Sequence, residues 1–391
     1  MRRLAAVAVL LAVSCSYPKV LPATVPEGPD RLGPTVQVRL TADASRVAVS
    51  SPAGFAVRAA GAGQPVTVSG AVALVAKAGG GVAVEAGGRV RLKSRDTLRL
   101  EPGGEAGFEL GERKYRGGLK VFRDAGGALA VVNVLPLEHY LYSVVPCEIG
   151  PIRQETFEAV KAQAVAARSF TITRLGRRKG LGHDLFDSYL RDQEYRGSGR
   201  ETELGRSAVD ATRGEVLRWQ GEVAEALYHA ACGGVTASGA KPFLRSVRDT
   251  PGQARNRPAF CSSSSHFSWQ VTLSRDSLER SLGRKAGTGR LRVWGLTLVR
   301  DQDSGRVAKV RVRTDRGSRD FSGPEFRFAL GLKSHWFDVK LSGRSVTISG
   351  HGWGHGAGMC QHGAVEMARR GYSCRQILEH YYSGVTVERL Y

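Results

Sequence analysis

The chain has 391 residues, long enough for one large domain or two of ordinary size, and 49 of them are glycine. A hydrophobic share of 42% suits a folded, loop-rich globular protein and argues against disorder throughout. The net charge of +21 favours an anionic partner. Nucleic acid is not the expected partner, because the basic residues are mostly scattered arginines without a basic helix or an aromatic-interleaved patch.

Residues 1–15 have the layout of a bacterial export signal, with two arginines, an apolar run and then Ser14-Cys15. The end of this segment is similar to a lipoprotein signal, in which Cys15 would be acylated; a secreted protein cut nearby is the alternative. No later segment approaches the roughly 20 apolar residues of a membrane-spanning helix. We therefore expect an exported envelope protein that meets the membrane only through a lipid at Cys15. An acidic envelope polymer would suit its charge.

The rest of the chain predicts an α+β fold. Residues 16–35 are proline-rich and read as a linker, and residues 36–114 form a β-rich N-terminal region of short alternating runs between glycine-rich turns. Residues 115–391 form a mixed domain with a substrate cleft. Within it we expect helices at 154–175, 361–370 and 374–382, and several strands between the first two helices.

Glu148 lies in the otherwise apolar stretch "VVPCEIGP", just before the helix 154–175. On that helix Lys161 and Arg168 fall close to the stripe of Phe157 and Ala164 that we expect to face inward. Cations at such positions either extend past the edge of the core or line a cleft. The neighbouring glutamate favours a cleft.

Two further stretches could carry chemistry. In "SGHGWGHGAGMCQHGAVEMA", residues 349–368, alternating glycines predict tight turns or a close approach to the backbone. This stretch lacks the Gly-Lys-Ser/Thr ending of a phosphate loop, and its glycines do not suit a zinc-binding helix, so no metal is expected there. The second stretch, "ALYHAACGGVTAS", reads as a strand that ends in Tyr228-His229 and a Gly-Gly turn.

The cysteines after the signal number five, so at least one thiol stays unpaired in the oxidising compartment that export implies. Two pairs are plausible disulfides on sequence alone, Cys232 with Cys261 and Cys360 with Cys374. Sequence does not choose the connectivity.

From about Tyr115 to the C-terminus the chain resembles the stage II sporulation protein D (SpoIID/LytB) family of peptidoglycan-remodelling proteins. The blocks that carry the resemblance occur in the family's order and spacing, and they are "NVLPLEHYLYSVVPCEI", "EAVKAQAVAARSF", "YHAACGG", "FLRSVRD" and "GWGHGAGMCQHGAVEMARRGYSCRQILEHYYSGV". The resemblance implies a lytic transglycosylase that cuts the bond between N-acetylmuramic acid and N-acetylglucosamine, in some members on glycan already stripped of its peptides. Glu148 matches the catalytic acid. We expect the substrate-binding residues to be Lys161, Arg168, Tyr228, His229, His355 and Gln361.

One carboxyl group suffices for this reaction, because the sugar's own C6 hydroxyl attacks the anomeric carbon and no water has to be activated. Glu148 would need a raised pKa, which apolar neighbours would favour. Two alternatives remain, a non-catalytic glycan-binding enhancer of an amidase and a hydrolase that pairs Glu148 with Asp187 or Asp249. An amidase is accordingly a candidate partner.

Some family members bind zinc through a His, Cys, His, Cys set in the loop after the helix. The matching stretch here, "HDLFDSYLRDQEYRG", keeps His183 but has Phe186, Arg191 and Asp192 where other ligands would be. We therefore expect no zinc in this loop, and no cofactor.

Overall fold

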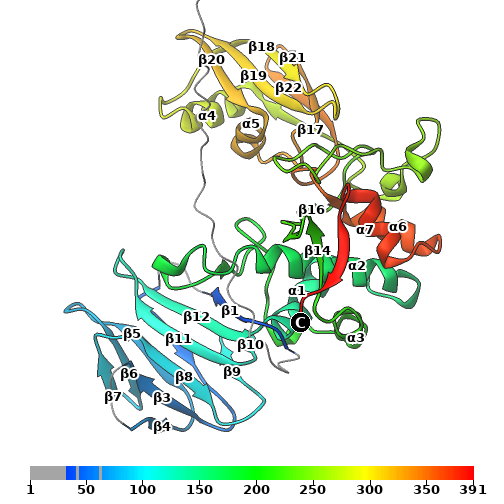
Figure 1. Cartoon of the computed structure of the whole chain (residues 1–391). Coiled ribbons are helices and arrows are strands. Elements are labelled where there is room, and N and C mark those ends of the chain that lie inside the picture. The colour runs from blue at the N-terminus through cyan, green and yellow to red at the C-terminus, as the bar shows by residue number, and fades with distance from the viewer. Residues whose placement is uncertain (1–31, 41–43, 61–63) are drawn as a thin grey trace, which may run out of the picture.

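A computed structural model describes residues 32–40, 44–60 and 64–391. The predicted signal segment, Cys15 and residues 16–31 of the linker lie outside the described residues. The fold is α+β, as predicted, and its elements gather in three lobes (Figure 1). No helix among the described residues is long and apolar enough to cross a membrane.

The N-terminal lobe is a sandwich of a seven-stranded sheet, in the order β13-β1-β12-β11-β8-β3-β4, and a four-stranded sheet, in the order β2-β5-β6-β7. Alternate side chains of both sheets, such as Leu74 and Val121, form one buried core. The strands and a small β9–β10 hairpin are β1 (Thr35–Arg39), β2 (Arg46–Val49), β3 (Phe55–Ala59), β4 (Val66–Val68), β5 (Val72–Ala76), β6 (Val82–Ala86), β7 (Arg89–Ser94), β8 (Leu98–Pro102), β9 (Phe108–Leu110), β10 (Arg113–Tyr115), β11 (Gly118–Arg123), β12 (Leu129–Pro136) and β13 (Leu185–Phe186). Strands β11 to β13 follow residue 115, so this sheet spans the predicted boundary at residues 114 and 115.

The central lobe contains the predicted helices and the largest core. The first predicted helix is a 3-10 turn at Gln154–Thr156 followed by an α-helix, and the two C-terminal helices pack against that α-helix (Figure 1). The elements of this lobe are α1 (Leu137–Glu148), α2 (Phe157–Ile172), α3 (Glu203–Ala211), β14 (Glu215–Trp219), β15 (Glu222–Val223), β16 (Tyr228–His229), β23 (Met359–Cys360), α6 (Gln361–Arg369), α7 (Cys374–Tyr381) and β24 (Thr386–Arg389). All three helix predictions are confirmed to within three residues at each end.

The third lobe is inserted between β16 and β23 and has a core of its own, built on two three-stranded sheets and two helices. Its elements are β17 (Ser268–Ser274), α4 (Arg275–Lys285), β18 (Val293–Arg300), β19 (Val307–Thr314), β20 (Gly317–Ser322), α5 (Gly323–Leu330), β21 (Phe337–Ser342) and β22 (Ser345–His351). The chain therefore leaves the central lobe after β16 and returns to it at β23.

Parallel pairing of β16 with β23 brings the two motif stretches together, with Tyr228 opposite Met359 and His229 opposite Cys360. The alternating glycines allow this approach. A Cβ on Gly358 would lie 1.9 Å from the carbonyl oxygen of Leu227, and one on Gly354 would lie 2.7 Å from the Cβ of His229. The close approach that the glycines predict is thus made by the chain's own backbone.

Candidate active site

Glu148 is the last residue of α1 and is partly exposed as a residue. Its Oε1 accepts the backbone N–H of Glu194 at 2.7 Å, and the side-chain amide of Gln361 donates to the same carboxyl group. Burial among protein atoms nevertheless dominates and raises the pKa of Glu148 to about 7. The raised pKa expected from the sequence is confirmed, and it makes this carboxyl group suitable for both giving and taking a proton near neutral pH.

Gln193, a buried residue directly before Glu194, holds the segment whose N–H donates to Glu148. The Oε1 of Gln193 accepts the hydroxyls of Tyr140 at 3.1 Å and Thr171 at 2.7 Å. Its Nε2 donates to the hydroxyl of Tyr228 at 2.8 Å. Since Gln193 is fully buried, these bonds fix residues 193–194 against α1, α2 and β16. Gln193 and Glu194 were not predicted from the sequence, because this stretch was compared only with a set of zinc ligands.

Tyr228 and Gln361, which we expected to bind substrate, lie close to Glu148. The negative charge of an ionised Glu148 is one of the influences that, after burial, raise the pKa of the Tyr228 hydroxyl, so the two groups are neighbours. Gln361 begins α6, is 8% exposed, and donates its amide to the side-chain oxygen of Gln163 on α2 at 3.3 Å. Helix α6 therefore brings the Gln361 amide to Glu148, 213 residues earlier in the chain.

The two predicted histidines are bound mainly by backbone. His355 accepts the N–H of Ala357 on Nδ1 at 3.1 Å and donates from Nε2 to the Tyr228 carbonyl at 2.9 Å. The residue as a whole is exposed, while protein atoms surround its imidazole. His229 is 4% exposed and donates from Nδ1 to the Ala357 carbonyl at 3.1 Å. Burial is the main cause that lowers the pKa of both imidazoles, to about 4 for His355. Both rings are therefore neutral near pH 7, and they brace the turn at 355–357.

Arg168 does not line a cleft, which corrects the prediction from the helix periodicity. It is fully buried and makes a bidentate ion pair with Glu138 of α1, with both N–O distances 2.8 Å. It also donates to the carbonyls of Glu215 at 3.0 Å and Val209 at 3.3 Å. Protein oxygens inside the core accept from four of its five N–H donors, and because Arg168 is 0% exposed, a glycan cannot reach the fifth.

Lys161 lies on the same side of α2 as Arg168 and is not brought to Glu148. Its Nζ pairs with Glu158 one turn earlier, at 2.6 Å, and lies over the ring of Phe157. The causes that shift the pKa of Glu148 include neither Lys161 nor Arg168. The prediction that these two cations share a cleft with Glu148 is therefore wrong for this structure.

The hydrolase alternative loses one of its two carboxylates. Asp249 is fully buried and accepts the hydroxyl of Tyr381 at 2.6 Å, so it is closed to a glycan. Asp187 is paired with Arg113 at 3.3 Å. The carboxylate whose charge acts on Glu148 belongs to Glu194, and it is engaged by Arg196 in an ion pair.

The loop that contains His183, in which we expected no zinc, is filled by contacts between its own side chains and Arg178. Asp192 pairs with Arg178 at 3.0 Å and accepts the N–H of Phe186 at 2.9 Å, while Arg191 lies over the Phe186 ring. His183 is 2% exposed and packs edge-on against Phe186.

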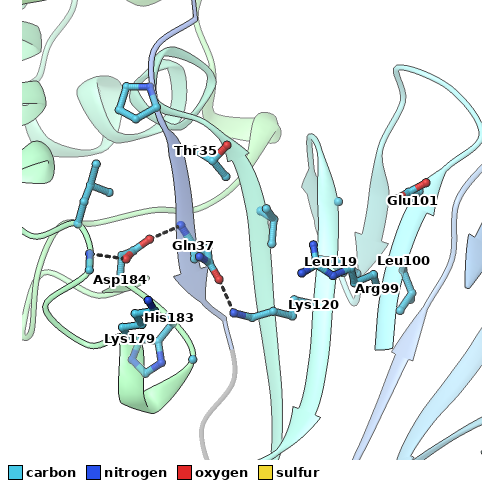
Figure 2. A pocket seen from close by; sticks show the side chains of 16 residues that line it. Thr35, Gln37, Arg99, Leu100, Glu101, Leu119, Lys120, Lys179, His183 and Asp184 are labelled. Atoms are coloured by element: carbon cyan, nitrogen blue, oxygen red, sulfur yellow. Dashed lines mark hydrogen bonds between the residues drawn. The ribbon is translucent and has the colours of Figure 1, made fainter. Parts of the chain in front are cut away.

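His183 also borders a hollow of about 690 Å³ beside the N-terminal sheet, where Gln37 links Asp184 to Lys120 (Figure 2). None of the predicted catalytic or substrate-binding residues lines this hollow.

The five described cysteines are free of disulfides. The sulfurs of Cys232 and Cys261 lie 3.4 Å apart, close but not bonded. Cys360 joins that pair, since its sulfur accepts the N–H of Cys232 at 3.2 Å. Cys374 instead begins α7, where its N–H donates to Glu158 at 2.7 Å. The pairing of Cys360 with Cys374 that the sequence left plausible is not formed, and Cys374 does not belong to the cluster around Cys360.

Two family models match separate segments of the chain. Residues 125–219 match a family model described as stage II sporulation protein, and residues 254–358 match one described as a domain of unknown function, DUF8618. Over 277 residues the chain is 30% identical to stage II sporulation protein D of Bacillus amyloliquefaciens, a match that covers 66% of this chain and 75% of that protein. The chain belongs to the SpoIID family.

Other relatives extend the family assignment. An uncharacterized protein of Brachyspira hyodysenteriae is 30% identical over 291 residues, which cover 72% of this SpoIID chain and 74% of that protein. The amidase enhancer of Bacillus subtilis is 26% identical over 288 residues, which cover 59% of this chain but only 38% of the longer relative. The SpoIID match ends at β14, and the DUF8618 match encloses the third lobe.

Proposed function

We propose that this SpoIID-family protein is an exported lytic transglycosylase that cleaves the MurNAc–GlcNAc bond of peptidoglycan and forms an anhydro ring on MurNAc. The observation that carries the proposal is Glu148, a partly exposed residue whose largely buried carboxyl group has a pKa of about 7. A single carboxyl group can run this reaction only if its pKa lies near the working pH, because it must act first as acid and then as base. Export and a lipid anchor at Cys15 belong to the same proposal.

The reaction takes two proton transfers at one carboxyl group. Protonated Glu148 donates to the glycosidic oxygen as the bond to the MurNAc anomeric carbon breaks, and the GlcNAc end leaves as an alcohol. The resulting carboxylate removes the proton from the C6 hydroxyl of MurNAc, whose oxygen then bonds to the anomeric carbon. The N–H of Glu194 and the amide of Gln361 stabilise the carboxylate between the two steps.

Exposed apolar side chains near Glu148 suit a sugar polymer. Tyr189 is 62% exposed and Leu190 71% exposed, and the N–H of Tyr189 is held by the Glu194 carboxylate at 3.2 Å. Sugar rings have apolar faces that stack on such surfaces. We place the glycan across this segment, and we propose that strands already stripped of peptides by an amidase fit it best.

A second candidate function is amidase enhancement without catalysis, favoured by the similarity to the amidase enhancer of Bacillus subtilis. In that case Glu148 would only hydrogen-bond a sugar, and an amidase would be the working partner. The two candidates differ in products, since an enhancer alone leaves the glycan strand intact.

The test is product analysis by mass spectrometry after incubation with intact and with amidase-treated peptidoglycan. We expect anhydro-MurNAc ends, and we expect Glu148→Gln to lower their formation by about 10²–10⁴-fold. Glu155→Gln is the matched control, because that glutamate is half exposed in the turn before α2. Reducing ends would indicate a hydrolase. Intact strands, together with a stimulated amidase, would establish the enhancer instead.

A further inference from the structure

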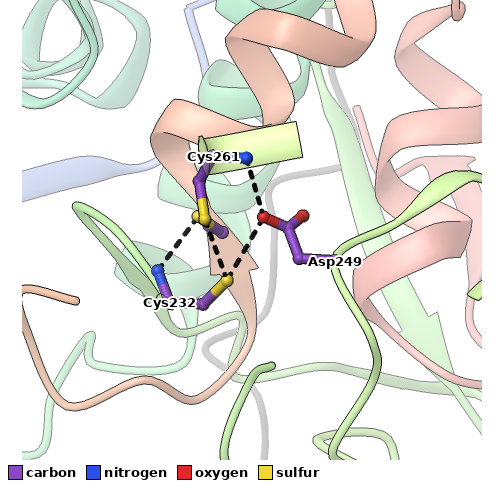
Figure 3. A group of neighbouring side chains, drawn as sticks. Cys232, Asp249 and Cys261 are labelled. Carbon is purple, nitrogen blue, oxygen red and sulfur yellow. Dashed lines mark hydrogen bonds between the residues drawn. The ribbon is translucent and has the colours of Figure 1, made fainter. Parts of the chain in front are cut away.

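Four side chains that can bind a metal ion converge in the interior of the central lobe. They are Cys232, Asp249, Cys261 and Cys360, all buried, and their ligand atoms all lie within 4.8 Å of one another. Figure 3 labels the first three. They come from three separate segments, the turn after β16, residues 249–261 and the end of β23. Glu148 is not among them, and Asp249 is closed to a glycan by its burial.

The groups around this cluster are arranged as outer partners of metal ligands. Backbone N–H groups point at two sulfurs, from Cys232 and Gly363 to Cys360 at 3.2 and 3.4 Å and from Gly234 to Cys232 at 3.3 Å. Such donors favour thiolate over thiol. The second oxygen of the Asp249 carboxylate is held by the Tyr381 hydroxyl, which aims the first oxygen at the thiols.

A buried cation beside the cluster indicates that the cluster is anionic. Arg306 is 2% exposed and donates to the carbonyls of Cys232 at 2.8 Å and Val235 at 2.9 Å. Among the ion pairs recorded for residues 32–40, 44–60 and 64–391, none includes Arg306. A buried charge without a counter-charge is costly. Three thiolates and a carboxylate around a divalent cation carry a net charge of −2, which would compensate it.

We propose that Cys232, Cys261, Cys360 and Asp249 bind one zinc ion in a closed, four-coordinate site. Thiolates about 2.3 Å from zinc lie about 3.8 Å apart in a tetrahedron. The observed separations of 3.4 Å between the sulfurs of Cys232 and Cys261, and 3.2 Å from Cys232 to the Asp249 oxygen, need only small shifts. Soft sulfur ligands select zinc over magnesium or calcium. The site departs from the expectation of no metal in this chain.

The role of such a site is structural, because protein atoms fill all four positions and none is left for substrate. Cys360 directly precedes Gln361, which reaches Glu148. The ion would therefore fix the start of α6 and the β16–β23 pair relative to each other. This role stands whether the protein is a transglycosylase or an enhancer.

The competing state is a disulfide between Cys232 and Cys261, which an oxidising compartment permits. It would draw the two sulfurs from 3.4 Å to about 2.05 Å. The Cys360 sulfur and the Asp249 carboxyl would then keep only their hydrogen bonds, from the N–H groups of Cys232 and Gly363 to the sulfur and from Tyr381 and the Cys261 N–H to the carboxyl.

The test measures metal content and thiol state on the full chain, purified without chelator. We expect one zinc per chain by elemental mass spectrometry, and at least a tenfold loss in Cys261→Ser and Cys360→Ser. Cys147→Ser and Cys374→Ser are matched controls that should keep the zinc, since neither thiol belongs to the cluster.

Because ligand variants can fail to fold, the unmutated chain is also exchanged into cobalt. We expect the visible bands of tetrahedral Co²⁺ and a near-ultraviolet thiolate-to-metal band. A chain that holds no zinc, or one whose denatured intact mass is lighter by two hydrogens with Cys232 joined to Cys261, would overturn the proposal.

Discussion

The two faces of helix α2 carry opposite kinds of polar group. One face presents Gln163 toward Gln361 and, through Ala167 and Thr171, contacts the glutamine that positions Glu194. The other presents Arg168 to a buried ion pair with Glu138. Arg168 is about 140° from Gln163 around the helix. The uncharged face of α2 thus contacts the glutamines that support the donors to Glu148, while the cation is paired on another face.

This separation has a physical reason. A guanidinium beside Glu148 would lower the pKa of that carboxyl and hold it ionised, which would remove the proton that the first step needs. An amide can hydrogen-bond either protonation state, so it can orient Glu148 although its N–H also lowers the pKa of that carboxyl group. Substitutions can test this contrast between the uncharged face of α2 that contains Gln163 and the charged face that contains Arg168.

Removing Arg168 should have the largest effect on stability. Arg168→Ala leaves Glu138 ionised in the core, and breaking a buried pair of this kind costs about 3–5 kcal/mol. The measurement is denaturant unfolding, with anhydro-product formation measured per folded molecule. The double variant Glu138→Leu with Arg168→Met should recover part of the loss, because apolar replacements restore packing. Normal stability with weakened glycan binding would return Arg168 to the cleft.

Glu148→Gln should change how stability depends on pH. Burial raises the folded-state pKa of Glu148 from 4.5 to about 7, so between these values the folded protein holds its proton more tightly than the unfolded chain. The stability from this group is therefore present below about pH 4.5 and lost as the pH rises through about 7. Relative to the wild type, Glu148→Gln should gain up to about 3 kcal/mol at about pH 8 and little at about pH 4. Equal gains at both pH values would contradict the raised pKa.

Gln361 should tune that pKa in the opposite direction. Its hydrogen bond lowers the pKa of Glu148, and a bond to a charged group contributes about 1.5–3 kcal/mol. In Gln361→Leu the pKa of Glu148 should rise, and the alkaline limb of the pH–rate profile should move to higher pH. Gln376→Leu is the control, because that amide caps α7 and does not reach the site. An unshifted limb with reduced activity would assign Gln361 to packing alone.

Sequence found the single carboxyl group but not what surrounds it. The helices at 157–172, 361–369 and 374–381 and the raised pKa of Glu148 followed from local pattern and apolar neighbours. The sequence could not show which side of α2 lies toward Glu148. Every residue from Ala162 to Thr171 is buried, so no apolar stripe distinguishes one side of the helix.

The partners of Arg168 and Glu148 were also hidden from the sequence. Glu138 precedes Arg168 by thirty residues, and Gln361 follows Glu148 by more than two hundred, so neither contact leaves a local signal. The cysteine cluster joins three segments in the same way. Long-range pairing of β16 with β23 creates it.

Replacing Lys161 should have the smallest effect on stability among these substitutions. Lys161 shares the face of Arg168, but its ion pair with Glu158 is partly exposed, with 22% and 34% of the two side chains accessible. Such pairs contribute about 0.2–1 kcal/mol. Lys161→Met, which keeps an apolar stem over Phe157, should therefore change unfolding by less than about 1 kcal/mol and leave anhydro-product formation and glycan affinity unaltered. A marked loss of glycan affinity in this variant would mean that the charged face of α2 takes part in binding, and the contrast between its two faces would fail.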